Sequence, residues 1–125
     1  MMTLIDEAVR AILLADPTVS DMVGTRIYPL ELPLTCTFPA IAYSFPSDPY
    51  KRVARAARCQ IDCFAEDFTE CKRLKIAIEN ALDGYSGTVD GINIEGIFPI
   101  SSYDLPPDET GIFHIPYDFK IIYRH

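Results

Sequence analysis

Four cysteines and two histidines are the side chains of this 125-residue chain that could act as nucleophiles or bind a soft metal ion. Cys59 and Cys63 lie four residues apart in an alternating stretch, so an extended strand would separate their Cα atoms by about 13 Å. That distance exceeds the ~7 Å limit for a disulfide and is too long for two thiolates to share one zinc ion. We therefore interpret these thiols as core side chains, because an unpaired cysteine behaves as a small hydrophobe.

Other groups that could do chemistry are scattered. A cysteine nucleophile needs a base, and the two histidines are His114, expected on the polar face of a strand, and His125, at a loosely held chain end. Asp104, Asp108 and Glu109 share a loop but lack the alternate spacing of a calcium-binding loop. The chain has no phosphate-binding glycine-rich loop and no Gly-x-Ser-x-Gly elbow. The sequence therefore predicts no catalytic residue, cofactor or metal site, and a protein that is not an enzyme.

One short basic stretch stands out from an acidic chain. Lys51, Arg52, Arg55 and Arg58 are four of the eleven bases and lie within eight residues that hold no acid. The other seven bases stand against all eighteen acids, a balance of −11 in a chain of net charge −7. Such an acidic body disfavours general binding of nucleic acid. The stretch could touch phosphates weakly, pair with acids of a neighbouring subunit, or be a solvated loop.

The clearest elements are a strand followed by a helix. Residues 56–65 alternate, with Cys59, Ile61 and Cys63 on one face, as a half-buried strand requires. Residues 67–82 repeat their apolar side chains at helical spacing. Asp67 is suited to cap the first turn of that helix, and Gly84 is suited to end it.

The remaining pattern predicts one small domain, residues 1–125, of α+β class. The further elements that we expect are a helix over 3–15, a single turn ending at 23, and strands over 26–28, 40–45, 88–89, 92–102 and 112–123. Asp90-Gly91 predicts a hairpin turn, Gly96 a bulge, and Pro116 an edge or bulge position in the last strand. The expected architecture is a two-layer sandwich, a mostly antiparallel sheet with two helices packed on one face.

Composition indicates what the protein contacts and where it is made. The hydrophobic content of 49% is high for a small domain, which indicates either a dense core or an apolar surface that faces a partner. Asp6 and Glu7 interrupt the first apolar run, so we expect no signal peptide and synthesis in a cytosol. No segment approaches the ~20 apolar residues of a membrane span, so we expect no membrane association.

Read end to end, the chain resembles the small tail terminator proteins of long-tailed phages, also called tail completion or head-to-tail joining proteins. The segments that carry the resemblance are the opening helix with Leu14-Ala15-Asp16-Pro17, then 23–29, Phe38-Pro39-Ala40-Ile41-Ala42-Tyr43, 58–65, 81–87, Glu109-Thr110-Gly111-Ile112 and Asp118-Phe119. None of these segments carries a mechanism alone. Their order and the length of the chain carry the match.

The resemblance implies a structural virion assembly protein without catalytic activity. Such proteins cap the tail tube as a homo-oligomeric ring, commonly a hexamer, and provide the surface on which the head connector docks. The expected partners are further copies, the tail tube protein, the head connector protein, and DNA that passes through the lumen without sequence-specific binding. The expected location is the tail end of the virion, with the host cytoplasm during assembly; the source could equally be a phage, a prophage or a gene transfer agent. Lys51, Arg52 and Arg55 would contact a neighbouring subunit, the tube or the lumen.

Two other functions remain open from the sequence. One is a small cytosolic ligand-binding or regulatory α+β domain, which would have a closed apolar pocket and form a defined small oligomer such as a dimer. The other is a small hydrolase, which would lose activity on Cys36→Ser or His114→Ala.

Overall fold

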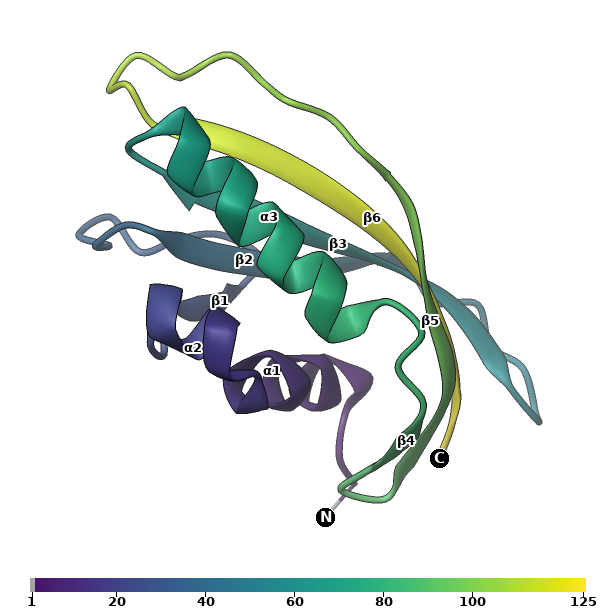
Figure 1. Ribbon diagram of the computed structural model, residues 1–125. Helices are drawn as coiled ribbons and strands as arrows, with labels where there is room; N and C mark the ends of the chain where they lie inside the picture. The colour runs from purple at the N-terminus through teal and green to yellow at the C-terminus, as the bar shows by residue number, and fades with distance from the viewer. Residues whose placement is uncertain (1) are drawn as a thin grey trace.

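The computed structural model describes residues 2–125, which form three helices and one six-stranded sheet (Figure 1). In chain order the elements are α1 (Ile5–Ala15), α2 (Pro17–Val23), β1 (Ile27–Pro29), β2 (Ala40–Ser47), β3 (Arg55–Ala65), α3 (Phe68–Leu82), β4 (Gly87–Val89), β5 (Ile92–Ser102) and β6 (Phe113–Arg124).

The strands lie in the order β1-β2-β3-β6-β5-β4. β1 runs parallel to β2, and the other neighbouring strands are antiparallel. The α+β class is confirmed, but the sheet is mixed and curls into a half-barrel with α1 and α3 on its concave side (Figure 1). Register shifts between β2 and β3 and between β5 and β6 contribute to this curvature, because an extra residue on one strand bends the pair.

The expectation of two helices was wrong by one. The single turn expected before residue 23 is the seven-residue helix α2, which packs against both α1 and α3. Its start is specified locally, because the Asp16 side chain accepts a hydrogen bond from the Val19 amide at 3.0 Å and Pro17 occupies the first turn. Gly24, with φ +59°, ends it.

The caps expected for α3 are confirmed. The Asp67 carboxylate accepts a hydrogen bond from the Glu70 amide at 3.0 Å, and Gly84 beyond the helix has φ +73°. Residues Cys71, Leu74, Ala77, Ile78 and Leu82 are buried on the face that meets the sheet. The sequence pattern therefore specifies both the ends of this helix and the face that it buries.

The β4–β5 hairpin and its bulge are also confirmed. Asp90 and Gly91 both have positive φ, at 47° and 89°, as a tight two-residue hairpin turn requires. The register of β5 against β6 shifts between Ile94 and Gly96. A Cβ atom added at Gly96 would lie 2.6 Å from the half-exposed Phe98 ring, so a larger residue at this bulge would displace that ring.

The structure changes one expectation for the last strand. β6 is an interior strand, paired with β3 from Phe113 to Tyr123, including the pair Asp62–Pro116. On its other side, regular pairing with β5 ends at Ser102–Tyr117, and the Pro116 carbonyl accepts from the Tyr103 amide at 3.3 Å. The nitrogen of Pro116 therefore faces the place where the β5 ladder has ended, and its missing donor costs no ladder hydrogen bond.

A single apolar cluster joins the helices to the concave face of the sheet. From β3 it includes Cys59, Ile61 and Cys63, the face that the alternation predicts. From β6 it includes Phe119 and Tyr123, which are at most 1% exposed. This core fixes the curved sheet and leaves both its ends and its convex face for other roles.

Candidate functional site

The basic stretch forms a hairpin connection at one end of the sheet. We call residues 48–55, which join β2 to the first residue of β3, the basic hairpin. The side chains of Lys51 and Arg52 are exposed, and among residues 2–125 they make no ion pair. Arg55 is half-buried, lies 3.5 Å from the Asp48 carboxylate and stacks 5.3 Å from the centre of the Tyr50 ring.

One carboxylate ties the basic hairpin to the end of β6. The Tyr123 hydroxyl donates a hydrogen bond of 2.6 Å to Oδ2 of Asp48. Burial, and then this hydrogen bond to a carboxylate, raise the pKa of Tyr123 to about 12. The other oxygen, Oδ1 of Asp48, is buried and has no partner in the described chain. The base of the hairpin is therefore held to the core, while its tip projects outward.

The hairpin borders a shallow hollow of about 180 Å³ with a basic lining. The lining residues are Tyr50, Lys51, Arg52, Val53, Arg55, Arg124 and His125. The structure thus brings Lys51, Arg52 and Arg55 together with the end of β6. Sequence reasoning did not assign Arg124 and His125 to this site. The signal needed to find them is the pairing of Arg55 with Tyr123, which only the register of β3 against β6 supplies.

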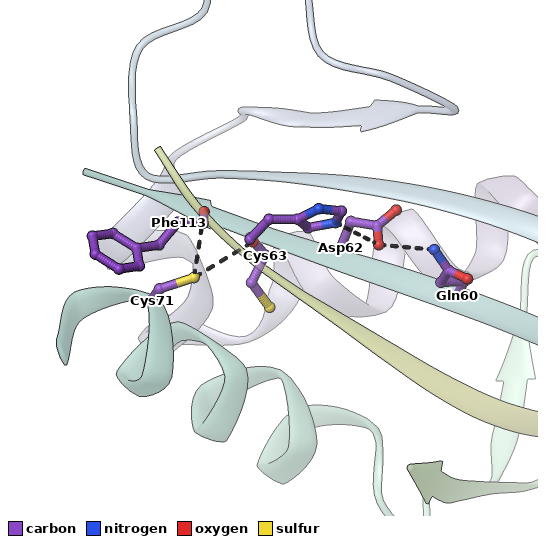
Figure 2. A network of polar contacts seen from close by, with 6 residues as sticks. Gln60, Asp62, Cys63, Cys71 and Phe113 are labelled. Atoms are coloured by element: carbon purple, nitrogen blue, oxygen red, sulfur yellow. Dashed lines mark hydrogen bonds and ion pairs between the residues drawn. The ribbon is translucent and has the colours of Figure 1, made fainter. Parts of the chain in front are cut away.

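A second polar cluster lies on the convex face of the same strands (Figure 2). Oδ1 of Asp62 lies 3.0 Å from Nε2 of His114 and accepts a hydrogen bond of 2.9 Å from Gln60. The His114 ring stacks on Phe64, with 4.3 Å between ring centres. This arrangement orients His114 as a member of a surface network, because its ring is held by an acid on one side and an aromatic ring on the other.

The thiols lie on the other side of the sheet from His114. Cys63 pairs with Ile115 while His114 pairs with Phe64, and alternate residues of a strand point to opposite faces. Burial raises the pKa of Cys63 well above its ordinary value, and that of Cys71 to about 11. Sγ of Cys71 donates to the carbonyl oxygen of Cys63 at 3.4 Å (Figure 2). These thiols are neutral at ordinary pH and serve the core, as the sequence predicts.

Arg58 belongs to the convex face and not to the basic hairpin. Its guanidinium lies 3.1 Å from Oδ2 of Asp118 on the neighbouring strand β6. Asp118 is 7% exposed, and its second oxygen has no partner in the described chain. The fourth base of the stretch is therefore used to neutralise a buried acid, which leaves the other three as the candidate contact residues.

The acidic loop organises its own backbone. Oδ1 of Asp108 accepts hydrogen bonds from the Thr110 amide, the Thr110 hydroxyl and the Ile112 amide, at 2.7–3.0 Å. These bonds lower the pKa of Asp108, with the Thr110 hydroxyl first among the causes. Asp104 instead pairs with Lys72 at 3.0 Å. Within residues 2–125, no three His, Cys, Asp or Glu side chains gather in a way that could hold a metal ion.

The length and polarity of the helices bear on whether any of them could span a membrane. Among the residues that the structure covers, α1, α2 and α3 are all too short or too polar to cross a bilayer.

Comparison with known proteins places these features in a family. Residues 7–124 match the family model described as tail completion protein gp17. Among solved structures, a chain of the virion of a native gene transfer agent particle is similar over 94% of this chain and 92% of its own length. The two share 17% of their residues and superpose with a TM-score of 0.72, which shows a common fold. A comparison with curated proteins finds no match.

Proposed function

This chain belongs to the tail completion protein gp17 family of structural phage tail proteins, and on that premise we propose that it caps the tail tube and forms the joint between tail and head. The observation that carries the proposal is the extent of the family match, residues 7–124, which includes every strand, α2 and α3, and all but the first two residues of α1. The similarity to a chain of a virion particle supports the same kind of assembly role.

We propose that the chain works as a homo-oligomeric ring, a hexamer by analogy with the proteins it resembles. Several large apolar side chains outside the core support a protein that buries surface against partners, among them Leu34 and Tyr50, which lie in connections between strands. A small subunit hides such side chains efficiently against another copy. A head-to-tail contact between copies closes into a ring when its rotation closes.

The other partners follow from the position at the tail end. These are the tail tube protein on one side of the ring, the head connector protein on the other, and DNA that passes through the lumen without sequence-specific contact. In this proposal the whole chain, residues 1–125, acts as one domain, is located in the virion and is assembled in the host cytoplasm. Lys51, Arg52 and Arg55 are its candidate contact residues.

Deletion of the gene from its parent phage or prophage tests this function. We expect filled heads and separate tails, seen by electron microscopy, and a loss of infectious or transferring particles. Purified protein added to the mixture should restore joined particles. As a control, the same protein with Leu74→Asp, which places a charge in the core, should restore none. Normal joined particles from the deletion strain would overturn the proposal.

A further inference from the structure

The two ends of the β3–β6 pair carry opposite charge. At one end Arg55 pairs with Tyr123, beside the basic hairpin and Arg124. At the other end Ala65 pairs with Phe113, and the connections there are acidic. Six carboxylates lie in those connections and in the first turn of α3, namely Glu66, Asp67, Glu70, Asp104, Asp108 and Glu109. We call residues 66–70 together with 103–112 the acidic end.

Part of each charged set is unused within the subunit. At the acidic end, Asp67 caps α3, Asp104 pairs with Lys72 and Asp108 holds its own loop. The side chains of Glu66 and Glu109 are exposed and make no ion pair in the described chain, as is true of Lys51 and Arg52. Two exposed free bases at one end thus match two exposed free acids at the other, where the half-buried Glu70 also makes no ion pair in the described chain.

Exposed apolar side chains accompany both sets. On the basic hairpin, Tyr50 is 75% and Val53 69% exposed. Next to the acidic end, Phe98 and Ile100 of β5 are 47% and 53% exposed. Apolar surface between charged groups is the ordinary composition of a protein interface, with an apolar centre and a polar rim.

The apolar side chains of β5 lie on a part of the sheet edge that no further strand of the described chain covers, although the Ile97 carbonyl there accepts a hydrogen bond from the Gly84 amide at 2.9 Å. β4 pairs with β5 only as far as Ile94, and no other strand of the described chain pairs with that side beyond it. Pro99 lies in this part of β5, and a proline weakens an edge as a template for a further strand. A partner would therefore pack on the side chains of this edge instead of extending the sheet.

The two ends cannot meet within one subunit. Ten residue steps separate Arg55 from Ala65 along β3, which corresponds to about 33 Å of strand. Charges so far apart are screened from each other at physiological ionic strength. Any complementary protein partner of either end therefore comes from another molecule.

We propose that the basic hairpin of one copy docks on the acidic end and the open β5 edge of the next copy. This inference rests on the proposed ring and names the surfaces that form it. Lys51 and Arg52 meet Glu66 and Glu109, and Tyr50 and Val53 cover Phe98 and Ile100. Because the two surfaces differ, the contact is head-to-tail and can repeat around a closed ring.

A second copy fits these observations better than DNA does. Phosphates would satisfy Lys51 and Arg52 but would leave the apolar side chains of both surfaces exposed. DNA would also approach a subunit whose net charge is −7. A neighbouring copy supplies both the acids and the apolar surface that the hairpin requires.

Charge reversal at each end, alone and in mixture, tests the pairing. The variant Lys51→Glu/Arg52→Glu makes both ends acidic, and Glu66→Lys/Glu109→Lys makes the acidic end more basic. Sedimentation velocity and electron microscopy would measure rings, formed by the full chain alone or on tail tubes that lack this protein. We expect each variant alone to lose at least about tenfold in ring yield, because like charges then face each other across the contact. A one-to-one mixture should regain most of the wild-type yield.

A matched variant separates position from net charge. Arg73→Glu changes the charge by the same amount as the single hairpin variant Lys51→Glu, and Arg73 is exposed on α3, outside the two surfaces. It should form rings as the wild type does. Three results would each overturn the pairing. They are an equal loss of ring yield in this matched variant, normal rings from both end variants, and a mixture that stays monomeric.

The outcomes also distinguish this inference from the proposed function. Wild-type rings with unaffected end variants would reject the surfaces and leave the ring intact. Wild-type protein that forms no ring, alone or on tail tubes, would reject both. Hairpin variants that form rings normally but fail to retain a DNA fragment would assign Lys51 and Arg52 to DNA and reject the docking of copies.

Discussion

The two faces of the β3–β6 pair are made from alternate residues of the same strands, yet they are organised by different forces. The concave face packs Cys59, Ile61 and Phe119 against helices in one apolar cluster. The convex face carries the network of Asp62 with His114 and the ion pair of Arg58 with Asp118, and no helix of residues 2–125 covers it (Figure 1). The comparison shows that the fold depends on the concave face, while the convex face and the two ends are free to serve contacts.

Alkaline pH should have the largest effect on stability, because burial on the concave side keeps several thiol and phenol groups neutral. The pKa values of Cys59, Cys63, Cys71, Tyr117 and Tyr123 are all raised, in each case first by burial. In the unfolded chain the thiols ionise near their ordinary pKa of about 9, so their stabilising effect is complete below that pH and declines above it. We expect a loss of several kcal/mol between pH 8 and 11.

Urea unfolding across this pH range measures the effect. Cys63→Ala should make the unfolding free energy fall less steeply as the pH rises from 9 to 11. The difference in slope should correspond to about one proton, since the variant lacks one of the groups that only the unfolded chain ionises. Stability that stays constant to pH 11 would mean that these side chains are accessible to water, and the contrast between the faces would fail.

Truncation of a core side chain should have the next largest effect. Leu74 of α3 is fully buried against the sheet, so Leu74→Ala should lower the unfolding free energy by about 3 kcal/mol. Ile76, two residues on, is 51% exposed, and Ile76→Ala should change it by less than about 0.5 kcal/mol. Equal effects at the two positions in urea unfolding would show that α3 does not pack as described.

Breaking the ion pair of the convex face should cost less. Arg58→Ala leaves the buried Asp118 carboxylate without its cation, and we expect a loss of about 1 kcal/mol because Arg58 itself is half exposed to water. Asp118→Asn removes the charge and should cost less than Arg58→Ala. The reverse order, measured by urea unfolding, would indicate that Asp118 is stabilised by groups other than Arg58.

The basic hairpin should matter least to stability. Lys51→Ala/Arg52→Ala removes two exposed side chains without a partner in the described chain, so the unfolding free energy should change by less than about 0.5 kcal/mol. Ring yield should nevertheless fall. A large loss of stability would place these side chains in the subunit's own structure and remove the contrast between core and ends.

Local signals explain the elements that the sequence predicted well. α3 is specified by Asp67, its apolar spacing and Gly84, and the β4–β5 hairpin is specified by Asp90-Gly91. Each signal lies within a few residues of the structure that it sets, so it can be read without knowledge of the rest of the chain. The sequence predicts only a single turn where α2 forms, because seven residues carry too few repeats to show a helical period.

Long-range contacts explain what the sequence did not reveal. The parallel pairing of β1 with β2 depends on contacts across the chain. The Arg10 guanidinium donates to the carbonyl of Ile27 at 2.9 Å, and that of Arg26 donates to the carbonyl of Pro39 at the same distance. The neighbours of the basic hairpin at Arg124 and His125 likewise depend on strand register. Periodicity gives the face of a strand but not its partner.

The distribution of the four cysteines has a practical consequence. Cys59, Cys63 and Cys71 are buried, whereas Cys36 is half-buried in the connection between β1 and β2. A mild alkylating reagent should therefore modify one sulfur quickly and reach the others only when the molecule opens. The rate at which the three buried thiols are alkylated therefore measures transient unfolding. Mass spectrometry can follow this rate without a label or an engineered probe.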